Sequence, residues 1–238
     1  HKAVIVLDRP NPNGSLVDGP ILEPAHKSFV GLDPLPIAHG LTVGELAIML
    51  NGEKWLAGGQ RCQLTVVPLA PGYTHAMAYH LPVRPSPNLP TDHAVALYPS
   101  ICLFEGTNVS VGRGTATPFE VIGSPAQPAT RAYSFTPAPN AGSPTPPLNG
   151  QRCYGLNLAD APTREGSGLV LKYLFDFYQQ STDKAHFFGK YFEELSGTTS
   201  LREQIIAGKT ETEIRASWEP GLGKFKTLRR KYLLYPER

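Results

Sequence analysis

The segment FEGTNVSVGRGT, residues 104–115, holds the densest group of side chains that could do chemistry. It combines a carboxylate with hydroxyl, amide and guanidinium groups on a glycine-rich backbone: Glu105, Thr107, Asn108 and Arg113. Arg113 can hold a carboxylate through two hydrogen bonds, and Glu105 can exchange a proton or bind hydroxyl groups. The segment therefore favours a polyhydroxylated, acidic ligand. The alternative is a rigid loop in which Glu105 and Arg113 pair with each other.

A second group of polar side chains follows the apolar run AVIVL, residues 3–7: Asp8, Arg9 and Asn11. The run is typical of a strand that is covered on both faces in a parallel sheet. Ligands of such sheets bind beyond the carboxyl ends of the strands, where these three side chains are expected. The alternative is that Asp8 and Arg9 pair locally and that Asn11 caps a turn.

Two further candidates stand near glycines. Asp18 in VDGP is a second carboxylate, although a lone acid in a Gly-Pro loop is more often a turn residue. His39 comes just before a helix cap at Thr42 and is the best placed of the scattered histidines. The sequence contains no helical metal-binding pair, no Gly-x-Ser-x-Gly elbow, no Walker loop and no dinucleotide-binding glycine pattern. It therefore predicts neither a metal nor a cofactor.

Composition limits the classes of protein that are possible. The chain has 238 residues, of which 41% are hydrophobic, enough for one large domain or two small ones. A net charge of +2 from 22 basic and 20 acidic residues does not predict nucleic-acid binding. The three cysteines lie far apart and favour small core residues, with one disulfide and one free thiol as the alternative. No apolar run approaches the roughly 18 residues of a membrane span.

The elements that position these residues change character along the chain. Residues 3–7 and 63–69 are predicted strands, and Thr42 with Glu45 forms a capping box that begins a helix between them. Prolines and glycines in the loop after residue 7 predict no regular structure there. The order strand, loop, helix, strand is that of an α/β layered domain. Four prolines in PVRPSPNLP, residues 82–90, predict the domain boundary, so that the domains are residues 1–83 and 84–238.

The second region is predicted to begin with a helix near residues 92–98 and a strand at residues 101–104. A proline-rich stretch with short aromatic strand pieces follows at residues 118–147. The remainder is predicted helical, with a second capping box at Thr210 and Glu213 before the last helix. The fold class is therefore α/β, or α+β overall, with a parallel-sheet portion followed by a mixed domain. The other predicted helices span residues 168–180, 184–195 and 201–207.

Several strings occur in an order that resembles the NamZ-type exo-β-N-acetylmuramidases, a bacterial family long described only as a domain of unknown function. The match runs from about residue 3 to the C-terminus. The specific strings are VLDRPNP (6–12), GP.L (19–22), SFVG (28–31), HG.T.GELA (39–47), PSPNLPT (85–91), YP (98–99), EGTNVS.GRGT (105–115) and KYLLY (231–235).

This resemblance implies a Rossmann-like N-terminal domain and a smaller C-terminal domain, with the substrate cleft where they meet. Residues 1–83 would be the last part of the first domain, and we expect the family's preceding strand-helix units, and with them full activity, to be missing from this chain. The implied reaction is hydrolysis of the β-1,4 bond between a non-reducing-end N-acetylmuramic acid and N-acetylglucosamine, which normally uses two carboxyl groups.

The resemblance also implies roles for individual residues. Glu105, and Asp18 next, would be the catalytic carboxyl groups, with the alternative that one member of the pair lies in the missing N-terminal segment. Arg9 or Arg113 would bind the lactyl carboxylate of muramic acid. The complete implied set of substrate-binding residues is Asp8, Arg9, Asn11, His39, Asn88, Thr107, Asn108 and Arg113.

Two rival functions stay open at this point, a non-catalytic peptidoglycan-binding or muropeptide-binding protein and a different hydrolase such as an amidase or esterase. The implied partner is a peptidoglycan-derived amino sugar, with neither a nucleic acid nor a membrane span. A location in the periplasm or outside the cell follows from that substrate. An uncovered sheet edge invites association, so we expect self-association or a partner chain.

Overall fold

The apolar run at the start of the chain forms strand β1 (Ala3–Leu7), and its predicted neighbour forms β4 (Gln63–Val67). The two strands pair in parallel over their full length, and helix α1 (Val43–Gly52) lies between them in the sequence. This confirms the predicted order of strand, loop, helix and strand. The computed structural model describes residues 2–164 and 168–238.

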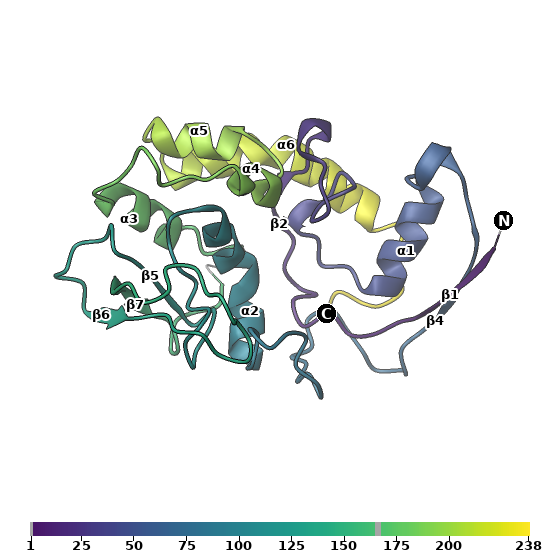
Figure 1. Ribbon diagram of the computed structural model, residues 1–238. Helices are drawn as coiled ribbons and strands as arrows, with labels where there is room; N and C mark the ends of the chain where they lie inside the picture. The colour runs from purple at the N-terminus through teal and green to yellow at the C-terminus, as the bar shows by residue number, and fades with distance from the viewer. Residues whose placement is uncertain (1, 165–167) are drawn as a thin grey trace.

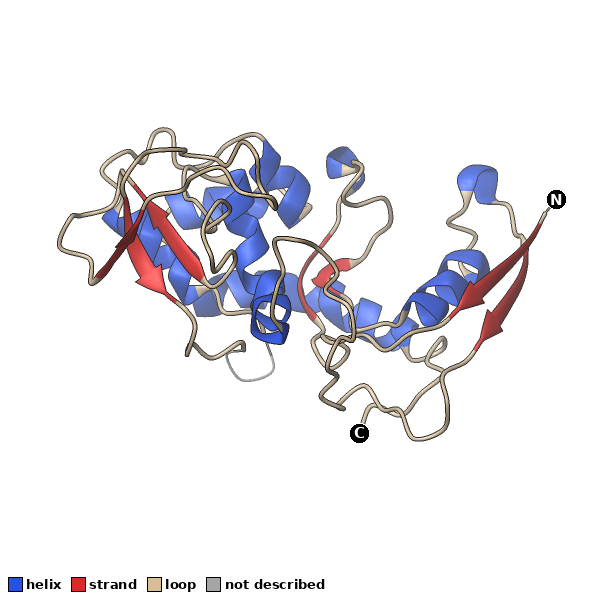
Figure 2. Ribbon diagram, turned by 60° about the horizontal axis from the view of Figure 1, so that its bottom comes forward, coloured by secondary structure: helices blue, strands red, loops and turns tan. Residues whose placement is uncertain are grey.

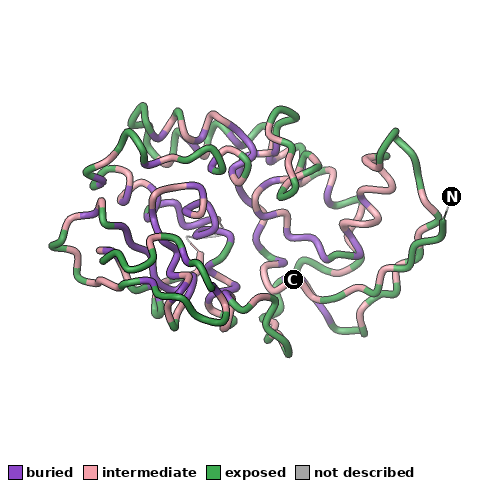
Figure 3. Tube along the Cα trace, viewed as in Figure 1, coloured by how far each residue is buried: buried purple, intermediate pink, exposed green. Residues whose placement is uncertain are grey.

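The prediction that β1 is covered on both faces is wrong. Val4, Ile5 and Leu7 expose 41%, 68% and 72% of their surfaces. Within the described residues this sheet contains only β1 and β4, and α1 is the helix that packs against it. Figure 3 shows these strands as a largely exposed arm at one end of the molecule. Apolar β-branched side chains are usually buried, but the described part of the chain does not cover both faces of this strand.

Two short strands, β2 (Asp18–Ile21) and β3 (Pro36–Ala38), form an antiparallel pair in the middle of the molecule. The prediction of no regular structure in this stretch is therefore wrong at these two places. Prolines are tolerated in such short strands because an edge strand leaves amide positions unpaired. The single turns η1 (Pro24–His26) and η2 (Ala57–Gly59) are 3-10 helices.

The chain forms two lobes. The first lobe contains β1 to β4 and α1, and the second lobe contains a small antiparallel sheet and a group of helices. Its strands have the order β5-β7-β6, and Figure 2 shows this sheet at the opposite end of the molecule from β1 and β4. The strands are β5 (Val121–Ser124), β6 (Tyr133–Phe135) and β7 (Cys153–Asn157). The helices are α2 (Asp92–Ile101), the 3-10 helix η3 (Cys102–Gly106), α3 (Lys172–Gln180), α4 (Tyr191–Ser196) and α5 (Ser200–Ile206).

The strand predicted at residues 101–104 is wrong, because α2 continues to Ile101 and η3 follows directly. Ile101, Leu103 and Phe104 are fully buried. A short run of buried apolar residues looks the same in a strand and in a buried helix, since neither shows alternation with polar residues. Glu105 therefore lies in a helical turn rather than at a strand end.

The other helices agree with the sequence to different degrees. Both predicted capping boxes form, at Thr42 in α1 and at Thr210 in α6 (Glu211–Arg229). The helix predicted to begin at residue 168 begins at Lys172, and residues 165–167 lie outside the described part of the chain. The helix predicted for residues 184–195 is reduced to α4, which begins at Tyr191.

Most buried apolar side chains form one large core in the second lobe, between α2, the β5-β7-β6 sheet and the helices α3 to α5. Its largest side chains include Phe104, Phe119, Phe177, Phe187 and Phe192, all fully buried. A smaller core lies in the first lobe, where Leu41 and Met49 pack beneath Phe225. The two cores are separate clusters of buried residues.

Helix α6 contributes to both cores. Ile214 and Trp218 from its first half are buried in the large core, and Phe225 from its second half is buried in the small one. In Figure 1 the helix runs along the top of the molecule from the second lobe to the side of α1. The relative position of the two lobes is therefore set largely by how this helix packs.

Replacing Phe225 by alanine tests whether α6 couples the two cores. We expect Phe225→Ala to lower the free energy of unfolding by about 3–5 kcal/mol, because a buried aromatic side chain is removed. Trp218 lies in the large core and Trp55 packs against the small one, so single-tryptophan chains (W55F or W218F) report each core by fluorescence in denaturant. Both transitions should shift together, whereas the exposed Lys224→Ala control should shift neither. A shift of the Trp55 transition alone would show that the cores unfold independently.

Candidate active site

Glu105 lies in the wall of a cavity of about 460 Å³ between the two lobes. One side of the wall comes from residues 20–39 and from α1, and the other side comes from α2, η3 and α4. Among the described residues this wall contains no lysine or arginine. We call this space the acidic cavity, after its three carboxyl groups, Asp33, Glu105 and Glu194.

The carboxylate of Glu105 is held by Arg113. Its Oε1 accepts hydrogen bonds from Nε and Nη2 of Arg113 at 2.9 and 2.6 Å, and the guanidinium lies 5.1 Å from the ring of Phe119. The pairing considered from the sequence therefore forms. It fixes the direction of the carboxylate through one oxygen, and Oε2 has no hydrogen-bond partner among the described residues. Arg113 is engaged here, so it is a poor choice for binding a substrate carboxylate.

Two tyrosines stand beside this carboxylate in the same wall. Tyr98 and Tyr191 expose 36% and 40% of their surfaces, which leaves ring faces available for a sugar. Burial raises the pKa of Tyr98 to about 12, with further contributions from Cys102 and Glu105. Burial, Glu105 and Glu194 raise the pKa of Tyr191 as well. Both phenols therefore remain protonated at neutral pH and can donate hydrogen bonds.

Asp33 and Glu194 are site residues that the sequence analysis missed. Neither side chain has a hydrogen bond or ion pair to another described residue. Burial raises the pKa of Asp33, and Lys27 only partly opposes that effect. A carboxyl group with a raised pKa is suited to donate a proton. No sequence signal marked either residue, because Asp33 lies in a proline-rich loop and Glu194 is one of two adjacent glutamates in a short helix.

A second cavity, of about 470 Å³, adjoins the first, and both are lined by His39 and Leu46. Its wall comes from residues 9–12, the first turn of α1, residues 81–85 and α2. We call it the basic cavity, because Arg9 and Arg84 line it and no acidic residue among the described ones does. The two cavities share His39 and Leu46 in their walls and carry opposite charges, and we refer to them together as the cleft.

His39 lies where the two cavities meet. Its Nδ1 accepts a hydrogen bond from the amide of Leu41 at 3.0 Å, which leaves the proton of the neutral ring on Nε2. Burial and then the nearby Arg229 lower the pKa of His39 to about 4. The ring is therefore neutral at physiological pH. It is suited to donate a hydrogen bond from Nε2 and unsuited to take up a proton.

Asp8 and Asn11 serve the local structure. The carboxylate of Asp8 accepts hydrogen bonds from Thr42 Oγ1, the amide of Gly44 and the hydroxyl of Tyr235. Asn11 donates its side-chain amide to the carbonyl of Leu41, and its side-chain oxygen accepts from a nearby backbone amide. Asn11 also lines the basic cavity, but both ends of its amide are already engaged. Their roles in substrate binding stay predictions.

The remaining sequence candidates line neither cavity. Asp18 is 6% exposed and accepts hydrogen bonds from Arg215 at 2.6 Å and from the amide of Leu169 at 2.7 Å. The other three have contacts within the second lobe. The side chains of Asn88 and Thr107 donate to the carbonyls of Gly142 and Phe104, and the backbone amide of Asn108 donates to the carbonyl of Phe187. Their placement does not favour the predicted catalytic role of Asp18 or the binding roles of the others.

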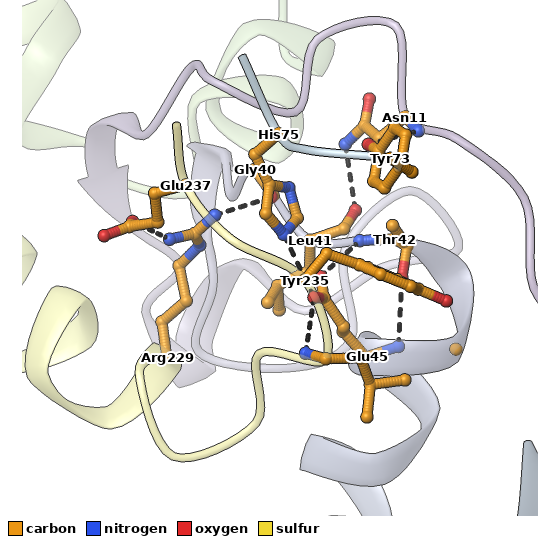
Figure 4. Close-up of polar contacts among 12 residues, drawn as sticks. Asn11, Gly40, Leu41, Thr42, Glu45, Tyr73, His75, Arg229, Tyr235 and Glu237 are labelled. Atoms are coloured by element: carbon orange, nitrogen blue, oxygen red, sulfur yellow. Dashed lines mark hydrogen bonds and ion pairs between the residues drawn. The ribbon is translucent and has the colours of Figure 1, made fainter. Parts of the chain in front are cut away.

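The buried carboxylate of Glu45 is the centre of a group of hydrogen bonds in the first lobe (Figure 4). Its oxygens accept hydrogen bonds from His75 Nε2 at 3.0 Å, the amide of Thr42 at 2.9 Å and the amide of Leu234 at 2.8 Å. Burial alone would raise the pKa of Glu45, but these hydrogen bonds outweigh it and lower the pKa. Glu45 and His75 are 0% and 2% exposed, so the pair is structural and out of reach of a substrate.

The same network ties the C-terminal residues to the cleft (Figure 4). Arg229 at the end of α6 is buried and donates to the carbonyls of His39 and Gly40 at 3.2 and 2.8 Å. It also pairs with Glu237. Since His39 lies between the two cavities, the end of α6 positions the centre of the cleft.

Other chemistries have little support in the described part of the chain. Cys62, Cys102 and Cys153 are free thiols, and burial raises the pKa of Cys102 to about 12, so this cavity residue stays protonated. No group of three or more His, Cys, Asp or Glu side chains there could hold a metal ion. The described helices also include none with the length and apolar character to cross a membrane.

The fold and the cleft define a two-lobed α/β protein with a carboxylate-rich cleft, an arrangement suited to glycoside hydrolysis. The chain belongs to the NamZ family. Residues 1–93 match the family model described as exo-beta-N-acetylmuramidase NamZ, N-terminal, and residues 96–235 match the C-terminal model of the same name. The resemblance stated from the sequence is thereby confirmed. The domain division at residue 83 stays a prediction.

Three similar proteins cover nearly all of this chain. The peptidoglycan beta-N-acetylmuramidase NamZ of Bacillus subtilis is 38% identical, and the match covers 97% of this chain and 59% of that protein. A crystal structure of a DUF1343 family protein from Bacteroides fragilis has a TM-score of 0.94 and 47% identity, covering 100% of this chain and 67% of the other. A second such structure has a TM-score of 0.77 and 25% identity, with 97% and 66% coverage. The predicted mixed α/β fold class is confirmed.

Replacing the buried carboxylate of Glu45 tests its structural role. We expect Glu45→Gln to lower the free energy of unfolding by about 3 kcal/mol at pH 7, because a neutral amide cannot accept all the buried hydrogen bonds. The pKa of Glu45 is lowered in the folded state, so its contribution is present above the unfolded pKa and is lost as pH falls. The difference between the two proteins in urea denaturation should therefore shrink below about pH 4.

The exposed Glu219→Gln variant is the matched control, and it should change the unfolding free energy by less than about 0.5 kcal/mol. Equal stability of Glu45→Gln and the parent chain at pH 7 would contradict the structural role of Glu45.

Proposed function

We propose that this chain hydrolyses the β-1,4 bond that joins a non-reducing-end N-acetylmuramic acid to N-acetylglucosamine in peptidoglycan fragments. The observation that carries the proposal is the acidic cavity, in which three carboxyl groups stand beside two protonated tyrosines. The Bacillus subtilis relative carries the name of this activity. Because the chain spans 59% of that relative, the activity of the whole relative is extended to this chain as a proposal.

In the proposed reaction one carboxyl group protonates the leaving oxygen and a carboxylate acts as base or nucleophile. Glu105 is suited to the second role, because Arg113 holds one of its oxygens and leaves the other unpaired. Asp33 is suited to the first role, because burial raises its pKa and its carboxyl group is unpaired among the described residues. Glu194 is the alternative proton donor in the same wall.

A non-catalytic muropeptide-binding protein is the second function that this cleft could serve. A binding protein would use the same cavity walls, but none of its carboxyl groups would contact the glycosidic oxygen of the ligand. The location that fits either function is the periplasm or the outside of the cell, where such fragments are produced. Detection of the mature protein in a periplasmic or culture fraction would support that location.

Replacing Glu105 tests the proposed chemistry. We expect Glu105→Gln to lower kcat for release of N-acetylmuramic acid from the MurNAc-GlcNAc disaccharide by about 100- to 10,000-fold. The assay uses this chain and, in parallel, the full-length Bacillus subtilis relative as a positive control. Glu219→Gln should leave turnover unchanged. Binding without release by either protein would favour the binding function, and full turnover by Glu105→Gln would remove Glu105 from the mechanism.

Asp33→Asn separates the role of proton donor from general damage to the site. Loss of the acid should slow hydrolysis of the disaccharide, but an aryl glycoside with a good leaving group needs no protonation and should be spared. The variant should also lose the alkaline limb of the pH profile. If Glu194→Gln shows this behaviour and Asp33→Asn does not, then Glu194 is the donor.

We also propose that the chain self-associates through the exposed β1 and β4 strands. Ile5, Leu7 and Val67 expose 68%, 72% and 45% of their surfaces, and an uncovered apolar edge favours pairing with a second copy. Light scattering after gel filtration should give a mass above 25.8 kDa that rises with concentration. Ile5→Lys should shift the protein towards monomer, whereas Ile206→Lys on the distant α5 should not. A monomer at all concentrations would contradict self-association.

A further inference from the structure

The charged groups of the cleft are divided between its two ends. The acidic cavity is lined by three carboxyl groups, and the adjoining basic cavity is lined by Arg9 and Arg84. A ligand that spans both cavities would therefore meet opposite charges at its two ends. Such an arrangement fixes the direction in which an asymmetric ligand binds.

Arg9 and Arg84 differ from most other arginines of the chain in having no side-chain partner. Five arginines form ion pairs within the described residues: Arg113, Arg131, Arg202, Arg215 and Arg229. Three more donate hydrogen bonds to oxygen atoms: Arg61, Arg152 and Arg164. The side chains without such a partner among the described residues are those of Arg9, Arg84, Arg230 and Arg238. Two of these four line the same cavity.

Both arginines are solvent-exposed, and no acidic side chain in the wall of the basic cavity pairs with them. The nearest acid in sequence, Asp8, is already engaged with Thr42, Gly44 and Tyr235 and does not line the cavity. The first turn of α1 also lies in the wall, and the amino end of a helix carries partial positive charge. The amides at that end are already engaged by the carboxylates of Asp8 and Glu45, so the unpaired positive charge of the wall is that of the two guanidinium groups.

His39 adds a neutral donor at the boundary of this cavity. Its Nδ1 is occupied by the amide of Leu41, and its Nε2 has no partner among the described residues. A hydroxyl or carbonyl oxygen of a sugar is the natural acceptor for that proton. His39 lines both cavities, with Arg9 and Arg84 in the wall of one and Glu105 in the wall of the other.

We propose that Arg9 and Arg84 form a subsite for a carboxylate of the substrate. Guanidinium groups bind carboxylates through paired, charge-assisted hydrogen bonds. This inference rests on the proposed function, which supplies a sugar with two possible sources of the carboxylate. One source is the lactyl carboxylate of unsubstituted N-acetylmuramic acid. The other is the C-terminal carboxylate of a stem peptide, which is joined to the sugar by an amide bond at the lactyl group.

Equilibrium binding tests the subsite without any need for turnover. Isothermal titration of this chain uses three probes: N-acetylglucosamine without a carboxylate, N-acetylmuramic acid with the lactyl carboxylate, and muramyl dipeptide with a peptide carboxylate. The carboxylate probe that fits should bind more tightly than N-acetylglucosamine and should weaken as salt rises. Arg84→Gln and Arg9→Gln should each weaken it about 10- to 100-fold and leave N-acetylglucosamine unchanged.

The matched control is Arg230→Gln, which removes an exposed, unpaired arginine outside both cavities and should bind every probe like the parent chain. A loss confined to N-acetylmuramic acid assigns the lactyl carboxylate, and a loss confined to muramyl dipeptide assigns the peptide. Equal binding of all three probes, or unchanged binding in both arginine variants, overturns the subsite even if the chain hydrolyses its disaccharide. Retention of the predicted losses in a chain without turnover supports the subsite and rejects only hydrolysis by this chain.

Discussion

The packing of one helix into two hydrophobic cores is the constraint on which the cleft depends. The first half of α6 places Trp218 in the large core, and its second half places Phe225 in the small core. Between the lobes, Arg229 at the end of this helix donates to the carbonyls of His39 and Gly40. A shift of α6 would therefore change both the separation of the cleft walls and the position of the residue at its centre.

The first lobe needs an additional polar centre, because its apolar core is small. Glu45 supplies it by joining the cap of α1, the ring of His75 and the C-terminal backbone at Leu234. A buried carboxylate is unfavourable unless its hydrogen bonds are satisfied, and here several donors converge on it. The arrangement joins segments that are 189 residues apart in the sequence. The walls of the basic cavity, built from residues 9–12 and α1, rest on this support.

The features that could be predicted from the sequence depend on residues close together in the chain or on long patterns of apolar and polar residues. The capping boxes at Thr42 and Thr210 form because each satisfies backbone donors within four residues. Glu105 was identified from its glycine-rich segment, but a separation of eight residues from Arg113 was compatible with both a ligand-binding role and a mutual pair. Asp33, Arg84 and Glu194 were missed, since their importance comes from loops and helices that meet only in the folded chain. The prediction of a strand at residues 101–104 was wrong, because a short apolar run shows neither the periodicity of a strand nor that of a helix.

The neutrality of His39 follows from the same packing and has a consequence for the whole cleft. Burial and the charge of Arg229 lower the pKa of His39 to about 4, so the centre of the cleft carries no positive charge at neutral pH. A charged imidazole there would attract a ligand carboxylate to the middle of the cleft. It would also share the wall of the acidic cavity with the carboxyl groups of Glu105 and Asp33. With a neutral ring, the positive charge in the walls is confined to Arg9 and Arg84. The division of charge along the cleft therefore depends on the desolvation of one histidine as much as on the charged residues themselves.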